Sequence, residues 1–201
     1  MGKKRHDIRV LMHRTFAVFL TVFLISDVGR VYASRNLEIA QQGETEENAM
    51  RAEAEKLKQE GLQLFKQESK ESLLAARKKF EAALILWEKL GDKIEQGFVL
   101  SAIGKIYSDL GENQKALQFY NQALPLQRAV GDKLGEATAL VNIGKIYSNL
   151  GEKQKALRIF VQTLPLYRAL GEKRGEAGNL SNIGTIYSDL GEKKKALEFF
   201  N

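Results

Sequence analysis

Cysteine is absent from this chain of 201 residues, and histidine occurs only as His6 and His13. Without cysteine the chain has no disulfide, no thiolate metal site and no cysteine nucleophile. Beyond residue 13 it also lacks the side chain that most often serves as a general base and as a metal ligand. Carboxylate-only or lysine-only chemistry stays open, but no constellation of such residues points to it. We therefore expect no enzymatic activity, no metal and no cofactor.

An excess of one charge is also missing once the chain is divided. The formal net charge is +6, and +4 of it lies in residues 1–33, where six basic side chains accompany two acidic ones. The remaining residues carry 25 basic and 23 acidic side chains. A general nucleic-acid binder needs a concentrated basic face. The balance therefore argues against nucleic acid as a partner.

The first 33 residues have the three parts of a secretory signal. Basic side chains come first, the uncharged apolar run Thr15–Ile25 follows, and small residues then precede a cleavage point between Ala33 and Ser34. We expect residues 1–33 to be a signal peptide and the mature protein to be exported, periplasmic or extracellular, without stable membrane insertion. The alternative is an uncleaved leader that anchors the chain. Against it, eleven apolar residues rise about 16 Å as a helix, about half of the hydrocarbon thickness.

Proline is rare, with Pro125 and Pro165 only, whereas glycine recurs with a 40-residue period, at Gly91, Gly131 and Gly171 and at Gly111, Gly151 and Gly191. Within one period, Leu140, Ile143, Tyr147 and Leu150 fall on one helical face that Gly151 ends. A second apolar face follows before Gly171, and two helices joined by few residues run antiparallel. Such a period predicts a stack of helix pairs, each unable to bury its apolar face alone.

Small residues inside the expected helices carry the resemblance to a known family. Each period repeats an apolar residue, Ile-Gly, Tyr, a turn Gly, Ala and an aromatic, as in Leu140, Ile143-Gly144, Tyr147, Gly151, Ala156 and Phe160. Glycine inside a helix costs about 1 kcal/mol relative to alanine, so its return at 104, 144 and 184 argues for a packing reason. The pattern resembles the tetratricopeptide repeat (TPR). The usual TPR unit has 34 residues, and the six extra residues here lengthen the segment between units by about a turn and a half of helix.

The resemblance implies an all-α fold, a right-handed superhelical solenoid of antiparallel helix pairs. We expect this solenoid over residues 54–201, with a degenerate unit at 54–90, units at 97–130 and 137–170 and an incomplete unit at 177–201. Residues 34–53 lack periodicity and are expected to form a flexible lead-in.

The resemblance also implies that the first helix of each unit lines a concave groove for extended or helical peptides. On these helices a stripe of short, mostly neutral side chains lies opposite the apolar face. Its members are the candidate groove residues Ser101, Lys105, Ser108, Asn142, Lys145, Ser148, Ser181, Asn182 and Thr185. A side-chain amide can donate to and accept from a peptide backbone. The alternative is that the two asparagine amides bond to a neighbouring helix.

The function that follows is an exported TPR scaffold that binds a peptide segment or partner protein in its groove. Its repeat sequence and its leader are similar to those of exported bacterial TPR proteins that often carry a downstream CHAT protease domain, which is absent here. The alternative function is therefore the truncated sensor or regulatory part of a larger CHAT-type protease or signalling protein. The open last unit also suggests self-association as a further partner mode.

Overall fold

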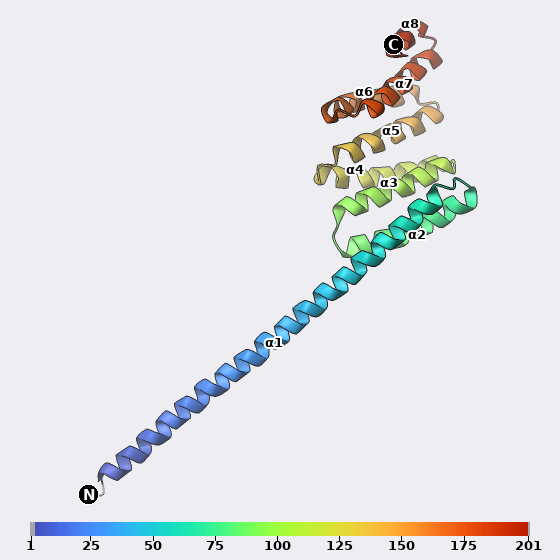
Figure 1. Cartoon of the computed structure of the whole chain (residues 1–201). Coiled ribbons are helices and arrows are strands. Elements are labelled where there is room, and N and C mark those ends of the chain that lie inside the picture. Colours follow the sequence, from blue (N-terminus) through green and yellow to red (C-terminus); the bar gives the residue numbers. More distant parts are fainter. Residues whose placement is uncertain (1–2, 201) are drawn as a thin grey trace. The chain divides into compact units, whose positions relative to one another are not determined.

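The computed structural model describes residues 3–200 and the side chains of residues 30–199. Over these residues the backbone forms eight helices and no strand (Figure 1). The helices are α1 (Lys3–Phe65), α2 (Lys70–Lys89), α3 (Lys93–Asp109), α4 (Asn113–Ala129), α5 (Lys133–Asn149), α6 (Lys153–Leu170), α7 (Lys173–Asp189) and α8 (Lys193–Phe200). The all-α prediction is thereby confirmed. The chain divides into two units, Met1–Ala49 and Met50–Asn201.

Residues 34–53 differ from the prediction of a flexible lead-in, because they are helical and lie within α1. The segment holds no proline and only one glycine, Gly43, and it is rich in alanine, glutamate and glutamine, which favour helix. Missing periodicity therefore showed only that this stretch has no apolar face to bury, not that it is unfolded. Most of the predicted signal peptide lies outside the residues whose side chains are described, and cleavage before Ser34 stays a prediction.

In the second unit, helices that follow one another along the chain pack together: α3 with α4, α5 with α6 and α7 with α8. These pairs lie over the predicted units 97–130, 137–170 and 177–201, but each first helix begins four residues earlier, at Lys93, Lys133 and Lys173. For α3 and α5 the reason is capping by an aspartate, whereas Glu172 before α7 makes no side-chain cap. The Asp132 carboxylate, for example, accepts a hydrogen bond from the backbone N–H of Gly135 at 2.9 Å, so the helix can start directly after the turn.

The connections between these helices share one geometry. Each contains a glycine in the left-handed conformation, with φ between 68° and 80°, at Gly91, Gly111, Gly131, Gly151, Gly171 and Gly191. The N–H of Gly111 donates to the carbonyl of Ser108 at 3.0 Å, and the N–H of Glu112 donates to that of Tyr107 at 2.8 Å. This is a Schellman motif, which only glycine enters without strain. The turns between units are as short as those within them, so the extra residues of the 40-residue repeat lie in the helices.

The two helices of a unit meet where an aromatic ring lies against a glycine. A Cβ atom on Gly61 would stand 2.9 Å from the ring of Phe80, one on Gly104 3.2 Å from Tyr120 and one on Gly144 2.5 Å from Phe160. All three rings are fully buried or nearly so. Glycine is unfavourable inside a helix, and the packing reason expected for its recurrence is this close contact with an aromatic ring.

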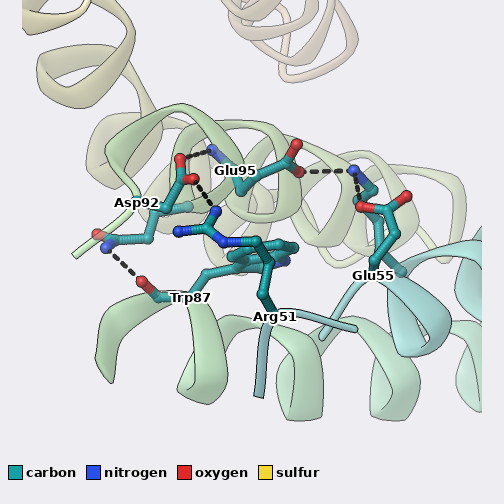
Figure 2. Close-up of polar contacts among 7 residues, drawn as sticks. Arg51, Glu55, Trp87, Asp92 and Glu95 are labelled. Carbon is teal, nitrogen blue, oxygen red and sulfur yellow. Dashed lines mark hydrogen bonds and ion pairs between the residues drawn. The ribbon is translucent and has the colours of Figure 1, made fainter. Parts of the chain in front are cut away.

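A cluster of charged side chains joins α1 to the connection between α2 and α3 (Figure 2). Arg51 pairs with Asp92 at 3.0 Å, and its guanidinium lies 5.7 Å from the centroid of the Trp87 ring. Burial opposes the ionisation of Asp92, but the backbone N–H of Glu95 and the guanidinium of Arg51 hold the pKa of this carboxyl below its usual value. Lys58 adds a second link, to Glu95 at 2.8 Å.

Arg51 stands one 40-residue period before Gly91, at a position where the later units have their turn glycine. Without that glycine the chain does not reverse, and α1 continues through this position as helix. The first pair of the second unit is therefore built from the C-terminal part of a much longer helix.

The glycine contact gives a stability prediction with an internal control. Gly144→Ala should lower the free energy of unfolding by about 1–3 kcal/mol, because the new methyl group overlaps the Phe160 ring. Gly178→Ala, in the interior of α7, meets no atom within 4 Å. It should raise stability by up to about 1 kcal/mol through helix propensity alone. Urea unfolding followed by circular dichroism measures both, and equal effects of the two substitutions would contradict the packing role of Gly144.

Candidate functional site

The first helices of three successive pairs enclose a hollow of about 580 Å³ in the second unit. Most of the lining residues come from α1, α3 and α5, and α2, α4 and the turn at Asp132 contribute the others. The lining residues are Leu62, Phe65, Phe80, Phe98, Ser101, Ala102, Lys105, Gln127, Asp132, Leu134, Gly135, Thr138 and Asn142. The hollow thus lies on the helices that the sequence assigned to the groove.

Large apolar side chains dominate this lining. Phe98 on α3 is 44% exposed and Leu134 on α5 is 46% exposed, although both are of a type that the core normally buries. Leu62 and Phe65 of α1 complete the apolar wall. Exposed apolar side chains that gather in a concave site usually indicate a binding surface, whereas single ones scattered over the surface do not. The structure therefore adds an apolar component to the short, neutral stripe expected from the sequence.

Leu62, Phe65 and Leu134 were missed because the sequence argument followed one helical stripe along units 97–201. Leu134 lies about two turns before Asn142, the first expected stripe residue on α5, and the other two residues belong to the degenerate unit at 54–90. A signal was present, however. The core positions repeat in every unit, and Phe98 and Leu134 are large apolar residues at positions outside that repeating set. Apolar side chains at such positions indicate a role other than the core.

Three of the nine candidate groove residues line the hollow, namely Ser101, Lys105 and Asn142. The Ser101 hydroxyl accepts a hydrogen bond from the Nε2 of Gln127 at 3.0 Å. Lys105 pairs with Asp109 one turn further along α3, and its ammonium lies 5.9 Å from the centroid of the Phe65 ring. The one cation in the lining is therefore neutralised by its own helix and shares an aromatic wall.

Asn142 is shared between the hollow and the core. Burial raises the pKa of the Tyr120 hydroxyl, the charge of Asp109 adds to this rise, and the neighbouring Asn142 amide opposes it. The Tyr120 hydroxyl nevertheless has no hydrogen-bond partner among the described residues, so the contact of Asn142 with a peptide and its alternative, a bond to a neighbouring helix, both stay predictions.

The other six candidates, Ser108, Lys145, Ser148, Ser181, Asn182 and Thr185, do not line this hollow. Lys145, Ser181 and Thr185 are exposed, and the remaining three are half-buried. The hydroxyl of Thr185 donates to the carbonyl of Ser181 at 2.9 Å within α7. The structure thus does not bring the nine candidates into one site, and contact of these six with a ligand stays a prediction.

Gln127 lies at the back of the hollow and comes from α4. Only 3% of this residue is exposed. Its Oε1 is buried and accepts no hydrogen bond from the described residues. Two glycines flank it: a Cβ on Gly97 would stand 3.2 Å from its Cγ, and one on Gly135 would stand 2.9 Å from its Nε2. Gln127 was not among the candidate site residues expected from the sequence.

Metal-binding clusters and membrane spans are missing from the part of the chain that the structure describes. In that part, no three or more Asp, Glu or His side chains gather into a metal site. No helix of that part is long and apolar enough to span a bilayer.

Comparison with known proteins identifies the repeat. The tetratricopeptide repeat family model matches residues 68–129 and 135–201. Aspartyl phosphate phosphatase F from Bacillus subtilis is similar in structure, with a TM-score of 0.69 and 15% identity over 74% of this chain and 38% of that one. The Rap conjugation gene regulator of plasmid pLS20, in complex with the Phr* peptide, has a TM-score of 0.63 and 16% identity, over 74% of this chain and 40% of that one.

A third similar structure is a signal transduction ATPase with numerous domains from Pyrococcus horikoshii, which has a tetratricopeptide repeat sensor. Its TM-score is 0.56, with 24% identity over 62% of this chain and 20% of that one. The chain thus spans about two fifths or less of the length of these structures, and at such identities the likeness shows the fold alone. No curated protein matches the sequence.

The family match covers most of the helix pairs and agrees with the glycine and aromatic spacing from which the resemblance was drawn. Its two segments together include more than half of the sequence. The chain therefore belongs to the tetratricopeptide repeat family.

Proposed function

We propose that this protein is a non-catalytic scaffold that binds a peptide segment or partner protein along its first helices. The observation that supports this function is the hollow between α1, α3 and α5, with Phe98 and Leu134 exposed in its walls. Transfer of a partner's apolar side chains from water into this site is favourable by about 25 cal/mol per Å². The charged residues of the lining are already engaged, because Lys105 pairs with Asp109 and Asp132 caps α5.

The structural neighbours add support of a general kind. The pLS20 regulator was solved in complex with the Phr* peptide, and 74% of this chain has the same fold as 40% of that protein. Two predictions from the sequence remain predictions: that nucleic acid is not a partner, and that the chain self-associates through the last helix pair.

The apolar wall gives the test of this function. Peptides selected from a random twelve-residue library against the full chain should bind in the hollow. The double variant Phe98→Ala with Leu134→Ala should weaken their binding about tenfold or more, because truncation of central apolar contacts commonly costs more than about 1 kcal/mol each. Isothermal titration calorimetry gives the affinities, and circular dichroism checks that the helical content is unchanged.

The control for that variant is Ile85→Ala with Val161→Ala. Ile85 on α2 and Val161 on α6 are 53% and 49% exposed and lie outside the hollow. This second pair removes the same kind of surface and should leave the affinities within about twofold, since scattered surface apolar residues carry little binding energy. If the control pair abolished binding while the groove pair did not, the site would lie on the outer helices.

We also propose that the protein is exported. The support is the basic, apolar and small-residue order of residues 1–33. Fusion of residues 1–40 to a reporter that is active only outside the cytoplasm should give activity, and sequencing of the product should begin at Ser34. Exported product that keeps Met1 would favour the anchored alternative. Soluble cytoplasmic product with an intact Met1 would contradict export altogether.

The second candidate function is a sensor within a larger signalling protein. The observation that favours it is the likeness to the Pyrococcus horikoshii ATPase, in which the tetratricopeptide repeats form a sensor. A sensor of this kind would use the same hollow for its signal. Mass spectrometry of the native protein distinguishes the two functions, because a sensor requires sequence beyond Asn201.

A further inference from the structure

Residues 87, 127 and 167 occupy the same place in successive helix pairs, and they are Trp, Gln and Tyr. Trp87 is 2% exposed and lies under the guanidinium of Arg51. Tyr167 is 6% exposed and packs against Gly175 of the next first helix, and burial raises the pKa of its hydroxyl. In the pairs before and after the middle one, a large aromatic ring therefore fills this level of the solenoid.

The middle pair has a shorter, polar side chain at this level, and the hollow opens beside it. The flanking glycines Gly97 and Gly135 add no side chain to the space. Phe98 does not close it either, because that ring lines the hollow and remains 44% exposed. The place where the neighbouring pairs hold an indole or a phenol is here an open, apolar site.

The amide of Gln127 gives this site a polar preference. Its Nε2 donates to Ser101, whereas its Oε1 is buried and accepts no hydrogen bond from the described residues. A buried acceptor without a partner is unfavourable, so a ligand that supplies an N–H or O–H at this point gains more than one that does not. The lining holds other donors, but none of them bonds to this oxygen: the Thr138 hydroxyl donates to the carbonyl of Leu134, and Lys105 pairs with Asp109.

We propose, on the basis of the scaffold function above, that the hollow is an anchor pocket for one aromatic side chain with a hydrogen-bond donor, a Trp or Tyr of the partner segment. The ring lies between Leu62, Phe65 and Phe98. The Oε1 of Gln127 is buried in the unbound chain, and on binding the side chain turns so that this oxygen accepts a hydrogen bond from the indole N–H or phenol O–H. The ligand supplies from outside the aromatic group that residues 87 and 167 supply from within the chain.

Other side chains fit this site less well. A charged side chain loses its hydration against an apolar wall. Phe and Leu fill the space but leave the Gln127 oxygen without a donor. Trp and Tyr combine a large apolar surface with one donor, and for this reason they are frequent anchors in protein interfaces.

Four peptide pools test the proposal with the full-length chain. Each pool is a twelve-residue library whose central position is fixed as Trp, Tyr, Phe or Leu. The Trp and Tyr pools should bind about fivefold more tightly than the Phe pool, which is the usual net gain of one hydrogen bond. Gln127→Leu keeps the size of the side chain and removes the acceptor, so the Tyr and Phe pools should then bind equally.

A second variant fills the hollow from inside. Gln127→Tyr restores the aromatic residue found at position 167 and should abolish binding of all four pools while the melting temperature stays the same or rises. If this variant fails to fold, the Gln127→Leu comparison alone decides the question. N-acetyltryptophanamide serves as a further probe, and its binding should be at least about a hundredfold weaker than that of the Trp pool because it lacks the flanking contacts.

Equal binding of the four pools to the unaltered chain would overturn the anchor pocket. So would a Tyr preference that survives Gln127→Leu. Neither of these results contradicts the scaffold function, which fails only if no library peptide binds or if binding ignores Phe98→Ala with Leu134→Ala. The two proposals therefore fail separately.

Discussion

An aromatic ring that packs against a glycine holds the two helices of a unit together. This contact lets the two helix axes come close together, and the other features of the solenoid depend on that short separation. The Phe160 ring lies close to the position that a Cβ atom on Gly144 would take. The rings of Tyr120 and Phe80 lie in the same way at Gly104 and Gly61. A Cβ atom would force the ring to shift, by most at Gly144 and by least at Gly104, which explains why glycine occurs at these positions despite its cost in a helix. The rings are thereby shielded from solvent almost completely, and the apolar faces on either side can stack from pair to pair.

The turns make that stacking regular. Left-handed glycines end the helices with one hydrogen-bond pattern, and the acidic residue that follows begins the next helix. Where the glycine is replaced by Arg51, the chain does not turn, and α1 runs on. The same arginine is then held by Asp92 and Trp87, so a residue that removes a turn also fixes the helix that results.

Departures from the repeat create the candidate site. In a perfect repeat each level would be filled identically, whereas here positions 87, 127 and 167 differ in size and polarity. The middle level holds a glutamine with an unpaired oxygen and exposes Phe98 and Leu134 around a hollow. The candidate site in this solenoid therefore arises from residues that do not repeat, while the residues that repeat form its packing contacts and turns.

The sequence by itself determined the helix pairs, the turn glycines and the family, because each depends on local spacing that recurs along the chain. Helical periodicity and left-handed glycines act within a few residues, so they can be recognised before the chain is folded. It did not determine that residues 34–53 are helical, since a helix without an apolar face has no periodic signal. Nor could it gather Leu62, Phe98, Gln127 and Leu134, which come from four helices in three pairs. Only tertiary packing decides which of the expected polar residues face this hollow and which, like Thr185, bond within their own helix. The reason is that the site depends on the space left between helices, and that space is set by side chains far apart in the sequence.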